Sequence, residues 1–138
     1  MILLDTDTVS LLAGGNENVV KHIKASTETV GTTVVTRIEI LRARFDFVLK
    51  AVDGEQLQRA QYWLDQSEAD LRKLLIVSVD AAAADQFDQL CKKKKLRKIG
   101  RADLLIASIA LANKATLVTR NLKHFRQISN LNIENWAD

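Results

Sequence analysis

Hydrophobic residues follow two different periods along this chain. Short apolar runs rich in β-branched residues predict strands, and longer segments with an apolar residue every three or four positions predict amphipathic helices. Strands are expected at residues 2–4, 30–35, 74–79, 115–119 and 131–133. Helices are expected at residues 7–13, 17–26, 36–50, 54–71, 81–95 and 98–112, with a short one through residue 125. This alternation predicts an α/β fold: a three-layer α/β/α sandwich with a mainly parallel central sheet.

The helical segments are expected to bury their apolar stripes. In residues 36–50 the stripe consists of Ile38, Leu41, Phe45, Val48 and Leu49. In residues 81–95 it includes Ala84, Phe87, Leu90 and Cys91, which places the only cysteine in the core. Residues 104–112 carry no charge at all and predict a helix that is buried nearly all round. Gly14 and Gly15 are expected to end the first helix as a C-cap.

Length and composition indicate one domain, residues 1–138, with an ordinary core and no linker or repeat. No apolar run approaches the roughly 20 residues that cross a bilayer, and the N-terminus lacks the positive region of a signal peptide. A single cysteine fits a reducing compartment, so a cytoplasmic protein without membrane association is expected. The chain has no cluster of Cys and His residues, which argues against a zinc site.

The net charge is +3, and its excess is concentrated in one segment. KKKKLRKIGR, residues 92–101, holds seven basic residues and no acid. This segment is either a solvated helix end, where lysines interact with the negative end of the helix dipole, or an edge that binds phosphate groups. Its position directly before Asp103 favours the second interpretation.

Asp103 lies at the start of the apolar helix, on the same face as Ile106, Ala107 and Ala110. A carboxylate that faces a core costs several kcal/mol unless it is paired, protonated or bound to a cation. The structural alternative is an interaction with the positive end of the helix dipole, worth about 0.3–1 kcal/mol. Asp103 alone does not decide between the two.

Other polar residues follow the predicted strands. Asp5 comes directly after the first strand, Glu39 shortly after the second, and Asn121 after the fourth. In parallel α/β sheets, ligands bind beyond the carboxyl ends of the strands. Acids that meet there repel one another unless a divalent cation compensates their charge, and an oxygen-only ligand set suits Mg²⁺ or Mn²⁺. The sequence therefore predicts a metal site that includes Asp5 and Asp103.

Each of these residues also has a structural alternative. Either Asp5 or Asp7 is a candidate N-cap for the helix that starts near Thr8, and Asn121 is a candidate for the short helix through residue 125. Glu39 has the spacing of a capping box with Thr36, and it could also form an ion pair with Arg42.

Four segments resemble the PIN domain family, and more closely the VapC toxins of bacterial toxin–antitoxin pairs. They are LLDTDTVSLL (3–12), TRIEILRAR (36–44), IGRADLLIASIALANKATLVTRNLKHF (99–125) and LNIENW (131–136). The resemblance implies a metal-dependent endoribonuclease that cleaves cellular RNA, tRNA being one candidate. Asp7 stands where the family commonly has Asn, and Asn121 stands where many PIN nucleases have a fourth acid.

The resemblance assigns roles to individual residues. It implies catalytic roles for Asp5, Glu39, Asp103 and Asn121, and an Mg²⁺ ion (or Mn²⁺) held by Asp5 and Asp103. The residues expected to hold the RNA are Thr6, Lys98, Arg101, Thr119 and Arg120, with Lys123 at the margin.

The resemblance also implies a protein partner, a small antitoxin that blocks the site. Tyr62 and Trp63 add aromatic bulk beside the predicted core stripe Leu57, Ala60 and Leu64, and are candidates for that contact. The alternatives are that Trp63 extends the core or joins the interface of a homodimer, and a homodimer is expected.

Two other functions fit parts of the sequence. LLDTDTV matches the D-x-D-x-T/V signature of haloacid-dehalogenase-type phosphatases, with Asp5 as nucleophile and Asp7 as general acid. Asp103 has no acidic neighbour on its helix, which argues against this enzyme. A basic module that binds nucleic acid without catalysis would explain the lysine run but not the convergent acids.

Overall fold

The computed structural model describes all residues, 1–138, and its centre is one sheet of five parallel strands. The strands are β1 (Ile2–Leu4), β2 (Val30–Thr33), β3 (Leu75–Val77), β4 (Thr116–Val118) and β5 (Asn132–Glu134). Their order in the sheet is β3-β2-β1-β4-β5, and every neighbouring pair is parallel. The chain moves outward from β1 to one edge and then returns to continue towards the other edge. β1 and β4 therefore lie side by side, although more than a hundred residues separate them.

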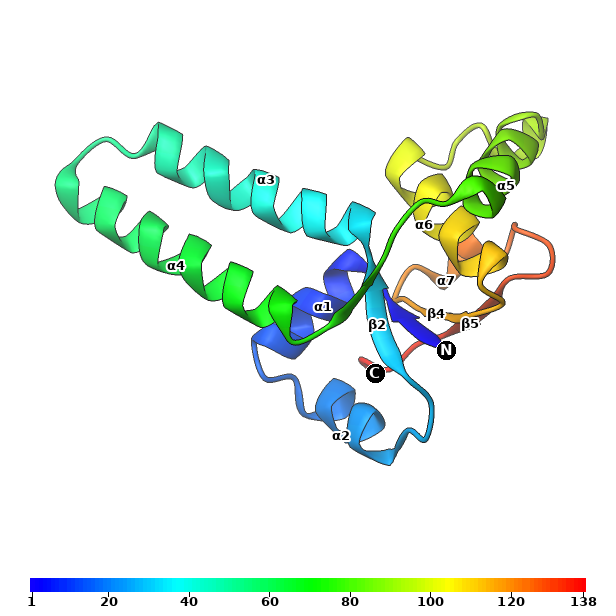
Figure 1. Ribbon diagram of the computed structural model, residues 1–138, viewed down its shortest axis with the longest axis horizontal. Helices are drawn as coiled ribbons and strands as arrows, with labels where there is room; N and C mark the ends of the chain where they lie inside the picture. The colour runs from blue at the N-terminus through cyan, green and yellow to red at the C-terminus, as the bar shows by residue number, and fades with distance from the viewer.

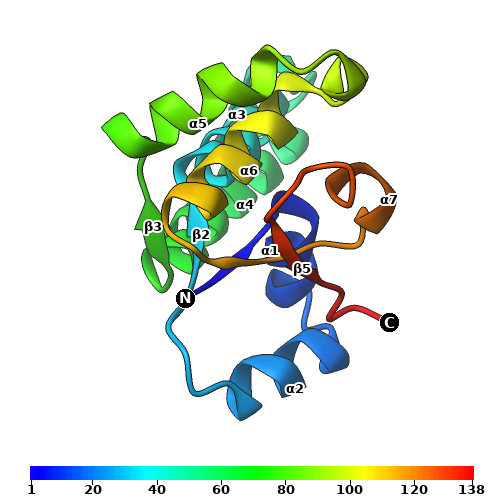
Figure 2. The ribbon, with the colours of Figure 1, turned by 90° about the vertical axis from the view of Figure 1, so that its right-hand side faces the viewer.

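Helices cover both faces of the sheet. They are α1 (Thr6–Ala13), α2 (Glu17–Ala25), α3 (Val34–Lys50), α4 (Gly54–Arg72), α5 (Ala81–Cys91), α6 (Arg101–Ala112) and α7 (Leu122–Phe125), with a 3₁₀ turn η1 (Lys94–Leu96). Figure 2 shows α5 and α6 on one side of the sheet and α1 and α2 on the other. The three-layer α/β/α sandwich predicted from the sequence is confirmed.

Two apolar cores lie on the two faces of the sheet. Side chains alternate between the faces along β1, so this strand contributes to both cores. Leu3 belongs to the larger core, with Leu117 and the buried face of α6. Ile2 and Leu4 belong to the smaller core, beneath α1 and α2. As predicted, α6 is buried almost all round from Leu104 onward.

Most predicted boundaries agree with the structure to within two residues. The start of the helix predicted at 98–112, which is Arg101, and the end of the helix predicted at 81–95 differ more. The strand predicted at 30–35 ends at Thr33, because Thr33 accepts a hydrogen bond from the backbone N–H of Thr36 and caps α3. The helix predicted at 81–95 ends at Cys91 and is followed by the separate turn η1. The predicted C-cap at Gly14 and Gly15 is confirmed, since Gly15 has a φ of 79°, which favours glycine.

The helices α3 and α4 form a long hairpin that projects away from the sheet (Figure 1). The stripe predicted for residues 36–50 is therefore partly wrong. Ile38, Phe45 and Leu49 are exposed, Leu49 to 82%. The stripe that packs against α4 is instead rotated around the helix, and Arg44 occupies its middle.

Cys91 was also expected in the core, and this expectation is wrong because its thiol is exposed. The buried stripe of α5 consists of Ala83 and Leu90, with Phe87 half-buried. Each residue turns a helix by about 100°, so a stripe that buries Leu90 directs Cys91 towards solvent.

None of the helices is both long and apolar enough to cross a membrane.

Candidate functional site

A small cavity of about 160 Å³ lies beyond the carboxyl ends of the central strands. Its lining residues come from α1, α3, α6 and α7 and from the turns before them: Asp5, Thr6, Asp7, Glu39, Asp103, Ile106, Asn121 and Phe125. The structure thus brings together the four residues predicted to be catalytic, together with Thr6. We call this cavity the acidic site.

Asp5 both caps a helix and faces the acidic site. Its carboxylate is buried, and one oxygen, Oδ1, accepts a hydrogen bond of 2.9 Å from the backbone N–H of Thr8. Its backbone N–H donates to the carbonyl of Val118 on β4, which fixes Asp5 between the two central strands. The second carboxylate oxygen accepts no hydrogen bond within the protein and is available to a ligand. The two interpretations of Asp5 are therefore compatible.

Glu39 is held in place by Thr6. The hydroxyl of Thr6 donates to Glu39 Oε1 at 2.6 Å, and it lies 3.0 Å from the hydroxyl of Thr36. Because the single hydroxyl proton of Thr6 goes to Glu39, the hydrogen bond between the two threonines is donated by Thr36. This chain of hydrogen bonds links α1 to α3 and directs the Glu39 carboxylate over the acidic site.

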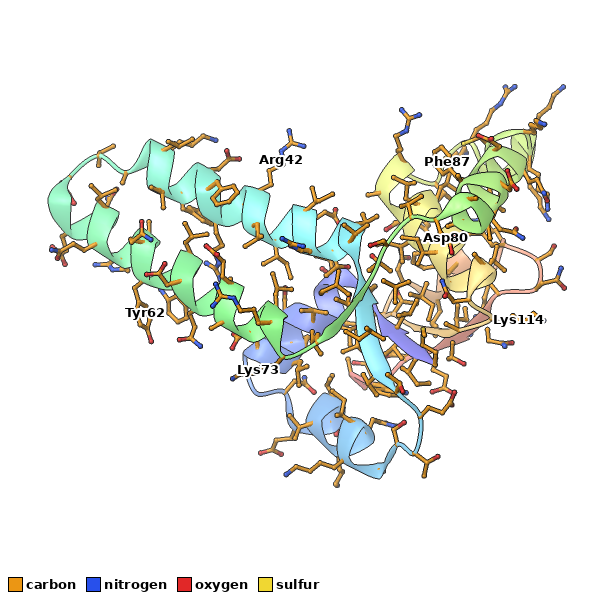
Figure 3. All side chains as sticks on the ribbon, viewed as in Figure 1. Arg42, Tyr62, Lys73, Asp80, Phe87 and Lys114 are labelled. Carbon is orange, nitrogen blue, oxygen red and sulfur yellow. The ribbon has the colours of Figure 1, made fainter.

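The structural alternatives proposed for Glu39 are not formed. A capping box would need Thr36 at the N-cap of α3, but Thr33 occupies that position and Thr36 lies inside the helix. Arg42 makes no ion pair with Glu39 and points outward from α3 in Figure 3. Glu39 is therefore free to serve the acidic site.

The environment of Asp103 opposes its charge. Burial raises the pKa of the Asp103 carboxyl above its ordinary value of 3.8, and the nearby negative charges of Glu39, Asp5 and Asp7 raise it further. The nearby imidazole of His124 acts in the opposite direction. A divalent cation bound here would relieve the repulsion between Asp103 and the other acids.

Asn121 reaches the acidic site from the start of α7. Its backbone N–H donates to the hydroxyl of Thr119, and its side-chain Nδ2 lies 2.9 Å from Nδ1 of His124. It makes no side-chain capping bond to α7, so the alternative role proposed for it is not observed. His124 was missed at the sequence level. The signal was present, because an Asn and a His three positions apart on a helix face each other.

The remaining residues predicted to hold RNA lie outside the cavity. Lys98 is exposed, and the Arg101 guanidinium lies over the ring of Phe87 at 5.6 Å. Arg120 is 4.0 Å from the carboxylate of Asp138. Thr119 is fully buried, and its hydroxyl accepts a hydrogen bond from the backbone N–H of Asn121.

The donor set of the acidic site suits a hard divalent cation. All candidate ligands are oxygens from carboxylates, one amide and one hydroxyl. No three Asp, Glu, His or Cys side chains are close enough together to enclose a metal ion. That spacing fits Mg²⁺, which usually binds one or two carboxylates and completes its shell with water and substrate phosphate.

The fold and the site define a class: a parallel α/β/α protein with carboxylates gathered at the carboxyl ends of its central strands. Within this class the chain belongs to the PIN domain family, whose model matches residues 2–131. The resemblance inferred from the sequence segments is confirmed.

The relatives match this chain over different shares of their length. Ribonuclease VapC2 of Rickettsia felis is 42% identical over 76 residues, and the match spans 52% of this chain but only 57% of that relative. Ribonuclease VapC1 of Haemophilus influenzae is 25% identical over 113 residues, covering 75% of this chain and 84% of that protein. The crystal structure of VapBC2 from Rickettsia felis, bound to a DNA fragment from their promoter, contains a chain that matches with a TM-score of 0.79 and 26% identity. That match covers 99% of both chains.

Proposed function

We propose that this protein is a metal-dependent endoribonuclease of the VapC type, the toxin of a toxin–antitoxin pair, with Mg²⁺ or Mn²⁺ as its cofactor. The observation that carries the proposal is the acidic site, where Asp5, Glu39 and Asp103 converge from three separate elements. The ribonuclease names of the relatives support the same activity. Cellular RNA is the proposed substrate class, with tRNA as one candidate, and the cytoplasm is the proposed location.

Each residue of the acidic site has a defined task in this proposal. Asp5 and Asp103 hold the cation, and Glu39 orients the attacking water by accepting a hydrogen bond from it. Asn121 contacts the substrate phosphate or a bound water through its amide. A bound divalent cation would lower the pKa of water and neutralise negative charge at the phosphodiester. Thr6 and Thr36 keep Glu39 in position, while His124 and Thr119 do the same for Asn121.

The alternative functions are less well supported. A haloacid-dehalogenase-type phosphatase needs a later pair of acids for Mg²⁺, whereas Asp103 has no acidic neighbour on its helix. A basic module without catalysis leaves the three convergent acids unexplained, because acids repel phosphate in the absence of metal. Membership of the PIN family favours the nuclease over both.

The decisive experiment incubates the purified protein with total cellular RNA in Mg²⁺, in Mn²⁺ and in EDTA, and maps the new ends. We expect cleavage at a limited set of sites with either metal and none in EDTA. Turnover of p-nitrophenyl phosphate without RNA cleavage would favour the phosphatase.

The proposed antitoxin site is a groove between α1 and the projecting hairpin. A cavity of about 540 Å³ lies between α1 and the hairpin, a second of about 340 Å³ lies between α3 and α4, and both are lined by Arg44 and Trp63. The Arg44 guanidinium lies over the Trp63 ring at 5.6 Å and donates to Ser67, while Trp63 remains 44% exposed. Tyr62 packs edge-on against Trp63 and points away from α3 in Figure 3.

This groove leads towards the acidic site. The larger cavity is also lined by residues of α1, including Val9 and Ala13, and the first turn of α1 carries Thr6 and Asp7. Because α1 has eight residues and rises about 1.5 Å for each, a partner seated in the groove has about 12 Å to cover to reach the acids. A short helix with an extended tail fits this requirement.

A homodimer is also part of the proposal, since several large apolar side chains lie exposed outside both cavities. They are Ile38, Phe45, Leu49 and Val52. Exposed apolar surface of this kind commonly marks a protein interface.

The Asn121→Asp variant tests whether Asn121 belongs to the metal site. The substitution adds a fifth carboxylate to the four that already line the cavity, so we expect Mg²⁺ to bind at least several-fold more tightly in the absence of RNA. Calorimetry measures this affinity. The matched control is Asn113→Asp, at the far end of α6, and we expect no change there. An unchanged affinity for Asn121→Asp would place Asn121 outside the metal site.

Neutralising Lys98 and Arg101 together to Gln tests the basic edge. We expect weaker RNA binding and a flatter salt dependence, because each lost phosphate contact reduces the slope by about 0.7 for single strands. Binding is measured in EDTA over a range of salt concentrations. The control, Lys21→Gln with Lys24→Gln, removes the same charge from α2. If both double variants change the slope equally, the effect is one of net charge and the basic edge has no specific role.

A further inference from the structure

A second polar cavity lies at the edge of the sheet opposite the acidic site. Its volume is about 450 Å³, which is within the range of small-molecule sites. It is bounded by α5, the end of α6, and the segments that lead into β4 and β5. The lining residues are Gln86, Gln89, Leu90, Lys93, Ala110, Leu111, Lys114, Ala115, Ser129, Asn130 and Asn132. We call it the rear pocket; Figure 3 shows Lys114 at the end of the molecule farthest from the hairpin.

The polar side chains of the rear pocket are unused by the protein. The amides of Gln86, Gln89, Asn130 and Asn132 make no side-chain hydrogen bonds, while neighbouring residues such as Asn113 do. The two lysines, Lys93 and Lys114, form no ion pair. None of the lining residues is acidic. The pocket therefore presents two uncompensated cations and several free amides around an apolar floor of Leu90 and Leu111.

The backbone at Lys114 gives an independent reason to expect a role for its side chain. Lys114 follows α6 with a φ of 51°, and its N–H donates to Leu111 while that of Ala115 donates to Ala110. Glycine is the favoured residue at such a helix end, because a side chain is strained at positive φ. The other non-glycine residue with positive φ is Asn130, and it lines the same pocket. The sequence thus places a strained lysine where glycine would stabilise the fold.

We propose that the rear pocket binds the phosphate of a ribonucleotide through Lys93 and Lys114, with the amide side chains facing its base. Lysines bind phosphate as point charges, and Asn and Gln pair with base edges through their donor and acceptor atoms. The same chemistry is offered by a free nucleotide and by one unit of an RNA strand. The site goes beyond the proposed nuclease function and does not depend on it, since the metal ligands lie at the opposite edge of the sheet.

Binding can be measured with metal-free protein in EDTA. The probes are the four ribonucleoside 5′-monophosphates, the corresponding nucleosides, inorganic phosphate and a short oligoribonucleotide. We expect saturable shifts of the backbone NMR signals of Lys93, Lys114 and Asn130 with the monophosphates, and at least tenfold weaker binding of the nucleosides. Tighter binding of the oligoribonucleotide would assign the site to RNA, whereas binding of monophosphates alone would assign it to a free nucleotide. The absence of saturable shifts at these residues with any phosphate overturns the proposal.

The Lys114→Gly variant separates binding from folding. It removes the cation and relieves the positive φ, so we expect an equal or higher melting temperature together with at least tenfold weaker binding of the monophosphates. Lys93→Gln is expected to weaken binding without relieving strain. Lys24→Gln, on the other face of the sheet, removes the same charge and is expected to leave binding unchanged. Equal effects of Lys24→Gln and Lys114→Gly would overturn the assignment of the phosphate to this pocket.

Discussion

The Asp103→Asn variant is expected to lose RNA cleavage by at least about 100-fold, equivalent to about 2.7 kcal/mol of transition-state stabilisation, while the metal-free protein becomes more stable. Both effects follow from one geometry. In the proposed site the carboxylate holds the cation, and without the cation its charge is opposed first by burial and then by the nearby charges of Glu39, Asp5 and Asp7. Asparagine has nearly the same shape, so the packing of α6 is retained. Cleavage is measured on a defined RNA in Mg²⁺, and stability by thermal unfolding in EDTA.

The stability gain depends on pH in a defined direction. Because the pKa of Asp103 is raised in the folded protein, the folded state binds a proton there more tightly than the unfolded chain does. The penalty from the charged carboxylate is therefore absent below its ordinary pKa of 3.8 and complete above the raised pKa. The difference in melting temperature between Asp103→Asn and the parent protein should be largest near neutral pH and should vanish in acid. If Asp103→Asn is less stable at neutral pH and still cleaves RNA, then Asp103 only stabilises α6 through the helix dipole.

Asp5 offers a matched pair of substitutions. Asparagine caps helices as well as aspartate does, so Asp5→Asn should keep the hydrogen bond to Thr8 and the fold while losing cleavage. Asp5→Ala should lose both cleavage and about 1 kcal/mol of stability. Full cleavage by Asp5→Asn would show that Asp5 serves only as a cap.

Truncation of Trp63 is expected to weaken the complex with the antitoxin by more than about 1 kcal/mol, or roughly fivefold in Kd. The ring lines both cavities and is half-exposed, so a partner helix seated there would bury it. The loss should be partly reproduced by Arg44→Lys, because lysine cannot stack a planar guanidinium on the ring or keep the bond to Ser67.

The partner for this measurement is the proposed antitoxin, and a small protein encoded next to this chain is the first candidate. Expression of the chain alone should slow growth, and co-expression of the neighbouring protein should restore it through a stable complex. Leu57→Ala is the matched control, because Leu57 is equally exposed on α4 but lines neither cavity. If Trp63→Ala and the parent protein bind the antitoxin with equal affinity, the antitoxin binds at another surface. Harmless expression of an active nuclease would contradict the toxin assignment and leave the catalytic proposal intact.

The sequence by itself determined the order and type of the elements, because each local pattern agrees with the fold. Apolar strands alternate with helices, a run without charges marks the buried helix α6, and glycines end α1. The positions of Asp5, Glu39 and Asn121 after strands predicted that these residues would lie at one edge of the sheet, and Asp103 was added to them by its place at the start of the apolar helix and by the resemblance to the PIN family. This inference works because parallel strands align their carboxyl ends at one edge of the sheet.

Only the tertiary structure decided which face of each helix is buried and how the site residues are held. The apolar spacing in α3 is compatible with more than one buried stripe. The stripe that packs against α4 contains Arg44, because that side chain stacks on Trp63 and donates a hydrogen bond to Ser67. The link from Thr6 to Glu39 and the pairing of Asn121 with His124 are likewise set by contact. Periodicity gives the spacing of the residues that can face a neighbouring element. The side chains of that neighbour decide which rotation about the helix axis has the lowest free energy.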